Sequence, residues 1–119
     1  MMEKTSKTNK ELTHYYLTKY AEKDLDAMNQ LFAEDIILRD WKIRVEGKKL
    51  ALQETQKNFE AAESIAIDVL QTYENSDTVA AELKITVNET EELYVVDVIT
   101  FNDANQISAI RAYLGRGDH

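Results

Sequence analysis

The 119-residue chain contains no cysteine and no proline, and it has only three glycines and two histidines. The absence of cysteine excludes disulfides, thiolate nucleophiles and cysteine-based metal sites. Two histidines, at positions 14 and 119, are too few for a metal centre built from several histidines, so we expect no metal site. Without proline, the turns are expected to use Asn, Asp, Ser and the few glycines.

Basic residues are also scarce: 14 Lys and Arg stand against 22 Asp and Glu, a net charge of −8. Nucleic acids and anionic membrane surfaces are bound by clustered cations, so this balance argues against both as partners. No apolar run is long enough to span a membrane, and residues 1–10 do not resemble a signal peptide. We therefore expect a cytoplasmic protein. Its 44% apolar and 30% charged residues are typical of one folded domain.

Three helices are predicted in the first half of the chain. Thr8 and Glu11 have the spacing of a capping box, which indicates a helix beginning there. Its apolar face carries Leu12, Tyr16 and Tyr20, which recur every four residues. Asp24 is a candidate N-cap for a short second helix over 25–32. Residues 48–62 lack proline, glycine and a β-branched run, which favours a third helix.

Strands dominate the rest of the chain. The β-branched segment 36–38 indicates a strand, with 43–45 as its partner and Gly47 after the pair. From Ser64 onward the apolar period is two, and polar turn clusters separate the segments, as in an antiparallel meander. These further strands are predicted at 65–69, 79–87, 93–101 and 107–114. The order of elements predicts an α+β domain over 10–116, with a sheet curving over the helices and polar tails at 1–9 and 117–119.

One residue does not fit a plain core. Asp97 is the only ionisable group in the segment 93–101, where both faces of the strand are otherwise mostly apolar. A strand of this kind is covered on both sides, so the carboxyl group meets a low dielectric whichever way it points. Burial of this kind raises the pKa of an acid and keeps it neutral. The structural alternative is an ion pair with Arg111 of the next strand.

Two further polar residues could face the same cavity. Tyr16 lies on the inner face of the first helix, although a core tyrosine with its hydroxyl at the surface is the commoner arrangement. Asp40 ends a strand directly before Trp41, where a carboxylate could line the mouth of a pocket or simply be solvated in a loop. His14 is expected at the surface and has no assigned role.

Together with their surroundings, these residues resemble the ketosteroid isomerase branch of the nuclear transport factor 2-like superfamily, also called SnoaL-like. The similarity extends from about Leu12 to Gly115. Its first part comprises Tyr16, Asp24-Leu25-Asp26, Leu31-Phe32-Ala33-Glu34-Asp35 and Asp40, and it needs no gap. Its later part comprises Gly47 before the third helix, Val96-Asp97 with Phe101-Asn102, and Arg111-Ala112 with Gly115. The resemblance implies a cone-shaped roll, in which a curved antiparallel or mixed sheet wraps around the N-terminal helices.

The resemblance also implies a site. Tyr16 corresponds to the family's oxyanion-binding tyrosine, Asp97 to the protonated acid that shares the oxyanion, and Asp40 to the base that moves the proton. The expected ligand is a small hydrophobic carbonyl compound, and no metal or organic cofactor is required. Its pocket is expected to be lined by Trp41, Phe59, Val95, Ile99 and Phe101.

Some positions depart from the family pattern. Trp41 stands where the family commonly has proline after the base, and the loop to Gly47 is shorter. Phe32 and Thr55 stand roughly where further tyrosines of the oxyanion network are expected, which implies a thinner network around Tyr16.

Two other functions compete with proton transfer, because this superfamily carries many activities. The chain could be a non-catalytic small-molecule-binding or dimerisation domain. It could instead perform epoxide or aldol chemistry if Arg111 points into the cavity between Asp97 and another carboxylate. The alternate face of the strand at 93–101 is also largely apolar, and we expect a second copy of the chain to cover it, forming a homodimer. That face carries Tyr94, Val96, Val98 and Thr100.

Overall fold

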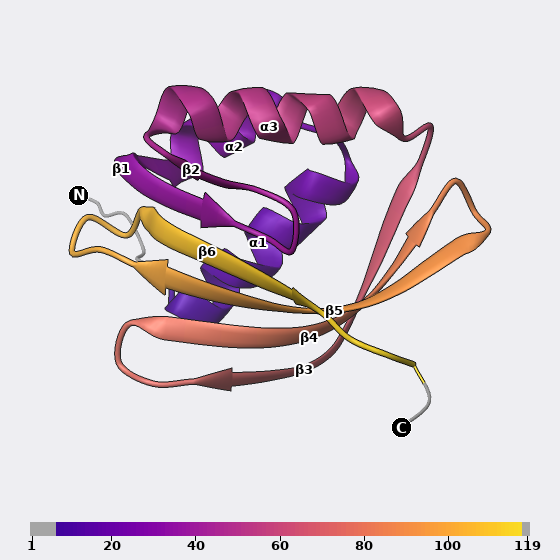
Figure 1. Ribbon diagram of the computed structural model, residues 1–119. Coiled ribbons are helices and arrows are strands. Elements are labelled where there is room, and N and C mark those ends of the chain that lie inside the picture. The colour runs from indigo at the N-terminus through magenta and orange to yellow at the C-terminus, as the bar shows by residue number, and fades with distance from the viewer. Residues whose placement is uncertain (1–6, 118–119) are drawn as a thin grey trace.

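The helices begin at the residues whose side chains cap them. In a computed structural model, which describes residues 7–117 (Figure 1), α1 spans Asn9–Ala21 and α2 spans Leu25–Leu31. Thr8 and Glu11 form the predicted capping box, with reciprocal bonds of 3.1 and 2.8 Å. The Asp24 carboxylate accepts a hydrogen bond from the backbone N–H of Ala27 at 3.0 Å. The third helix, α3, spans Lys48–Ala61, so all three predicted helices are confirmed.

The first strand begins earlier than the sequence indicated. β1 spans Phe32–Arg39 and follows α2 without a loop, whereas Phe32 was expected at the end of the helix. Phe32 and Ile36 are both fully buried, so the chain enters the core directly on leaving α2. A short apolar run is compatible with either a helix end or a strand, and here packing decides. β2 (Arg44–Glu46) pairs antiparallel with β1.

The remaining strands form the predicted meander. They are β3 (Ile65–Glu74), β4 (Thr78–Val87), β5 (Glu91–Phe101) and β6 (Ile107–Leu114). The six strands form one sheet in the order β2-β1-β6-β5-β4-β3. All neighbours are antiparallel except β1 and β6, which run parallel. Register shifts in β1, β3 and β5 break the pairing locally, and such bulges increase the bend of a strand.

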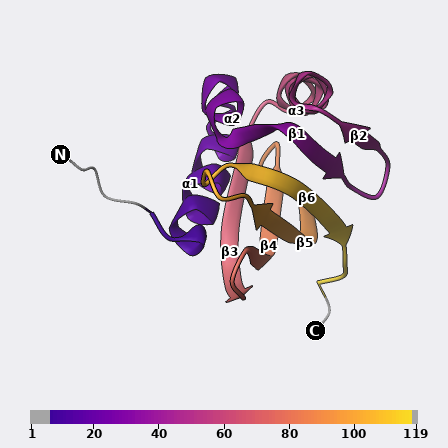
Figure 2. The same cartoon turned by 90° about the vertical axis from the view of Figure 1, so that its left-hand side faces the viewer.

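All three helices lie on one side of the curved sheet (Figures 1 and 2). α1 contacts β3 and β4, while α3 contacts β1 and β2, so the two helices cover opposite ends of the sheet. Figure 2 shows α1 beside β3 and α3 above β1 and β2. The α+β prediction, with a mixed sheet around N-terminal helices, is confirmed. The predicted tails at 1–9 and 117–119 lie largely outside the described residues, and Asn9 already belongs to α1.

The alternation along β5 separates an inner and an outer face. Val95, Asp97, Ile99 and Phe101 are buried on the side of the helices. The alternate residues Tyr94, Val96, Val98 and Thr100 are only half-buried on the other side. No helix in residues 7–117 covers them. No helix among these residues is long and apolar enough to cross a membrane. The curved inner face, bordered by α1 and α3, therefore positions the candidate site.

Candidate functional site

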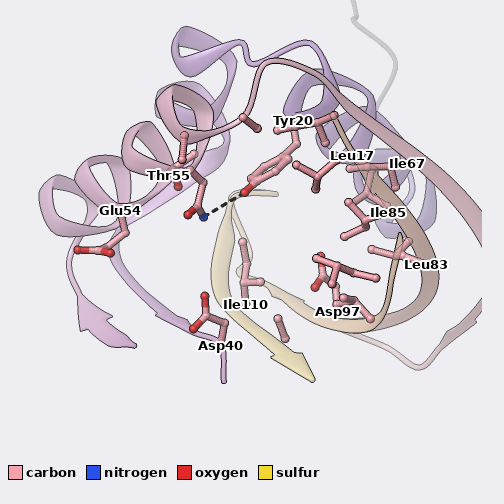
Figure 3. A pocket seen from close by; sticks show the side chains of 18 of the residues that line it. Leu17, Tyr20, Asp40, Glu54, Thr55, Ile67, Leu83, Ile85, Asp97 and Ile110 are labelled. Carbon is pink, nitrogen blue, oxygen red and sulfur yellow. Dashed lines mark hydrogen bonds between the residues drawn. The ribbon is translucent and has the colours of Figure 1, made fainter. Parts of the chain in front are cut away.

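A cavity of about 480 Å³ lies between α1, α3 and the concave face of the sheet (Figure 3). Its walls are mainly aliphatic and come from β3, β4 and β5, with residues such as Ile67, Leu83, Ile85 and Val95. Its polar groups come from α1, α3, the turn after β1, the middle of β5 and the turn between β4 and β5. Volumes of 300–1,000 Å³ with few polar groups are typical of small-molecule sites.

Asp97 forms part of the sheet side of the cavity. On β5 it stands between Ala81 of β4 and Ala112 of β6, and these small neighbours leave space above the carboxyl group. Asp97 is only 8% exposed, and no hydrogen bond or ion pair to it exists within residues 7–117. Burial raises the pKa of Asp97 to about 7, and the negative charge of Asp40 adds to the increase. The group is therefore an acid that keeps its proton far above the usual pH range of an aspartate.

Arg111 does not neutralise this carboxyl group. In the pairing of β5 with β6, Arg111 is opposite Val98 and Ala112 is opposite Asp97. Arg111 therefore projects to the outer face, where it lies near the Tyr113 hydroxyl together with Arg39. The ion pair considered from the sequence is thus wrong, because neighbouring residues of a strand point to opposite faces.

Tyr16 supplies a second buried polar group. It is 4% exposed, and its ring packs against those of Tyr20 and Phe32, with centroids 5.9 and 6.4 Å away. Tyr16 lines the cavity, and its hydroxyl has no hydrogen-bond partner in the part of the chain described. Burial, and then the charge of Asp97, raises the pKa of Tyr16 well above its usual value. The phenol therefore stays protonated and can donate a hydrogen bond to a ligand.

Asp40 lies at the end of β1, across the side chain of Ile110 from Asp97 (Figure 3). Its Oδ1 accepts hydrogen bonds from the backbone N–H groups of Lys42 and Ile43, at 2.7 and 2.9 Å. These bonds fix the turn after β1 and orient the carboxylate. Its Oδ2 has no partner among residues 7–117 and is available to a ligand.

The structure separates the predicted pocket residues into two groups. Trp41 and Val95 line the cavity, and Trp41 is 43% exposed beside Asp40. Phe59, Ile99 and Phe101 are not among the lining residues and are buried in the core. Phe59 is separated from the cavity because its ring packs edge-on against the ring of Tyr20, with centroids 4.9 Å apart.

Tyr20 and Asn58 are two site residues that were not predicted from the sequence. Both line the cavity, and the Asn58 amide donates a hydrogen bond of 3.2 Å to the Tyr20 hydroxyl (Figure 3). The available signal was the position of Tyr20 one helical turn after Tyr16.

Thr55 also lines the cavity, but its hydroxyl donates to the Ala51 carbonyl within α3. Among the described residues, no three His, Cys, Asp or Glu side chains gather where they could hold a metal ion.

The Asp97→Asn variant tests the protonation state of the buried acid through the pH dependence of the unfolding free energy. The folded chain binds this proton more tightly than the unfolded chain, so the contribution of Asp97 to wild-type stability declines as pH rises from about 4 to about 7. Asparagine cannot ionise, so the variant escapes this decline. We expect its unfolding free energy, relative to wild type, to increase by about 1–3 kcal/mol over this range, as measured by urea unfolding. The exposed control Asp35→Asn should show no comparable change, and a pH-independent effect of Asp97→Asn would contradict a neutral Asp97.

Comparisons with known proteins agree on the fold. The sequence model of the SnoaL-like domain matches residues 13–110, and no curated protein matches. An NTF2-like protein of unknown function from Cytophaga hutchinsonii superposes with a TM-score of 0.80 at 14% identity, over 95% of each chain. SalBIII, an epoxide hydrolase/cyclase-like enzyme of pyran ring formation in salinomycin, gives 0.78 at 24% identity, over 90% of each chain. A Kribbella flavida protein, provisionally named a ketosteroid isomerase, gives 0.79 at 17% identity, over 93% of this chain and 80% of its own.

At these identities the solved structures establish the arrangement of helices and strands and leave the chemistry open. The names among them cover isomerase-like, cyclase-like and epoxide hydrolase-like proteins. The family model, in contrast, matches the sequence itself, from the middle of α1 to the middle of β6. The chain therefore belongs to the family of SnoaL-like domains.

Proposed function

We propose that the protein is a proton-transfer enzyme that acts next to the carbonyl group of a small hydrophobic compound. One observation carries the proposal: two protonated donors, Tyr16 and Asp97, are buried without partners among residues 7–117, beside a cavity that is also lined by Asp40, whose Oδ2 has no partner among the same residues. A buried polar group without a partner is costly, so such groups indicate a ligand that completes their hydrogen bonds. The cavity volume of about 480 Å³ suits a ligand of two to four small rings.

The proposed reaction is an isomerisation, so no atom is gained or lost. Asp40 Oδ2 removes a proton from the carbon next to the carbonyl of a β,γ-unsaturated ketone, which leaves a dienolate. Tyr16 and the neutral Asp97 donate hydrogen bonds to the dienolate oxygen, where the negative charge develops. Asp40 then returns the proton to the γ-carbon, which gives the conjugated ketone and restores the carboxylate.

Epoxide or aldol chemistry assisted by Arg111 has less support. Arg111 faces the outer side of the sheet, and no other arginine in residues 7–117 lines the cavity. Among the described residues, the only cationic side chain along the wall is that of Lys42, in the turn after Asp40. The names of the epoxide hydrolase-like neighbours therefore do not determine the reaction proposed here.

The first test is isomerisation of a β,γ-unsaturated 3-ketosteroid and of the smaller 3-cyclohexen-1-one, followed by the ultraviolet absorbance of the conjugated product. Removing a general base typically costs 10²–10⁴-fold, so we expect Asp40→Asn to lower kcat at least about 100-fold. Asp35→Asn is the matched control, because Asp35 is an exposed carboxylate on β1, the strand that Asp40 directly follows. Equal rates in wild type and Asp40→Asn would exclude Asp40 as the base for these substrates.

The second test is the pH dependence of the same reaction. Asp97 must keep its proton to donate a hydrogen bond, so kcat/KM of the wild type should decline as pH rises above about 7. Asp97→Asn retains a donor that does not titrate, so the alkaline decline should disappear and the rate should stay within about tenfold of wild type. Asp97→Leu lacks any donor and should lose about 100-fold or more. An unchanged alkaline decline in Asp97→Asn would remove Asp97 from the proposed mechanism.

A second candidate function is ligand binding without catalysis. The observation in its favour is the double backbone contact of Asp40 Oδ1, which gives this carboxylate a structural role in the turn. A binding domain would bind a phenolic dienolate mimic such as 5,6,7,8-tetrahydro-2-naphthol and lose affinity in Tyr16→Phe. It would show no turnover of either ketone.

We also propose that the chain forms a homodimer through the outer face of β5. Val96 and Val98 lie at the centre of this face, half-buried and uncovered by any helix in residues 7–117. Removing such an apolar surface from water favours association. By light scattering, we expect wild type to have twice the chain mass. Val98→Glu should be monomeric, and Ala66→Glu on the outer face of β3 should remain dimeric. A monomeric wild type would contradict this proposal.

A further inference from the structure

Tyr20 differs from the other polar groups of the cavity, because its hydroxyl already has one partner. The Asn58 amide nitrogen donates to the Tyr20 oxygen at 3.2 Å. A phenol hydroxyl can accept a hydrogen bond and donate its own proton, whereas an amide NH₂ can only donate. The Tyr20 proton is therefore directed away from Asn58, and no acceptor for it exists within residues 7–117.

The surroundings hold the Tyr20 ring in place. Its ring packs edge-on against Phe59 and at a tilt against Tyr16, with centroids 4.9 and 5.9 Å away. Figure 3 shows the side chain reaching from α1 into the cavity, with its hydroxyl at one end of the dashed hydrogen bond, whose other partner is the Asn58 amide of α3. Asp40 and Asp97 lie on the sheet side of the same space.

Tyr20 is closer to the solvent than the other two donors. Tyr16 and Asp97 are 4% and 8% exposed, whereas Tyr20 is partly buried and Asn58 is exposed on the surface of α3. A ligand whose oxygen is bound by Tyr16 and Asp97 would therefore extend past Tyr20 on its way out. Burial, followed by the charges of Asp97 and Asp40, raises the pKa of Tyr20, while the Asn58 bond acts in the opposite sense. The hydroxyl thus remains a donor.

We infer that Tyr20 is a second hydrogen-bond donor for the ligand, that Asn58 is the positioning residue that turns its proton into the cavity, and that the preferred ligands carry two oxygens. One oxygen is the reacting carbonyl, and the other is an acceptor such as a ketone or ether at the end nearer to the mouth. This inference rests on the proposed function for the first oxygen only. The orientation of the Tyr20 proton can be tested without any ligand.

The first experiment measures the direction of that hydrogen bond. With 3-fluorotyrosine at position 20, ¹⁹F NMR reports the titration of this phenol alone. A bond donated by Asn58 stabilises the phenolate, so Asn58→Ala should raise the pKa of residue 20 by roughly half a unit or more. Gln53→Ala, an exposed amide elsewhere on α3, should leave it unchanged. A lowered pKa would mean that Tyr20 donates to Asn58, and an unchanged one that the bond is absent; either result overturns the inference.

The second experiment measures ligand preference by calorimetry. The probes are 5,6,7,8-tetrahydro-2-naphthol, with one oxygen, and 6- and 7-hydroxy-1-tetralone, which add a ketone at two spacings. At least one tetralone should bind wild type about three- to tenfold more tightly than the naphthol, the effect of one neutral hydrogen bond. Tyr20→Phe and Asn58→Asp should both abolish this advantage, the latter because a carboxylate attracts the phenol proton. Tyr15→Phe, on the exposed side of α1, should preserve it.

The outcomes separate this inference from the proposed function. If no tetralone is preferred by wild type, or if Tyr20→Phe keeps the preference, Tyr20 is not a second donor and the inference fails. If the naphthol does not bind, or binds equally to Tyr16→Phe, the proposed function fails instead. The ¹⁹F titration then still decides the role of Asn58.

Discussion

The transfer of the Asp97 carboxyl group from water into an aliphatic cavity is the constraint on which the site depends. No cation or hydrogen-bond donor in residues 7–117 offsets this transfer, so the group keeps its proton at pH values where a surface aspartate is charged. The neutral acid is then a donor and raises no barrier to an apolar ligand. Ala81 and Ala112 leave room above it, so the same position provides both the polarity and the space of the site.

The alternation of side chains between the two faces of the sheet determines which charged groups reach the cavity. Because side chains alternate between faces, Asp97 points inward while Arg111, almost opposite on β6, points outward. A register shift by one residue would exchange these faces and place a guanidinium in the cavity. The register of β5 with β4 and β6 therefore puts an acid in the cavity and keeps the arginine out of it. Similarity of fold alone would not distinguish these two arrangements.

Much of the fold follows from local patterns in the sequence. Capping residues such as Thr8 and Asp24 fix helix starts through short-range hydrogen bonds, and the period of two after Ser64 marks the strands. The start of β1 at Phe32 could not be predicted, because the short apolar run 31–33 is compatible with both the end of a helix and the start of a strand. The unusual setting of Asp97 was visible in the sequence. The burial of Phe59 behind Tyr20, and the contact between Tyr20 and Asn58 across 38 residues, depend on how α1 and α3 pack.

The place of β6 in the sheet has a consequence for the order in which the site can be made. β6 lies between β1 and β5 and, within residues 7–117, is the only strand that joins the two halves of the sheet. Its partner β1 is more than 70 residues earlier in the chain, and pairings between such distant segments form slowly. Ile110 and Ala112 of β6 are also part of the cavity wall. On the ribosome, the helices and the β3–β5 meander can therefore emerge and associate, but the cavity is not enclosed until β6 inserts between β1 and β5.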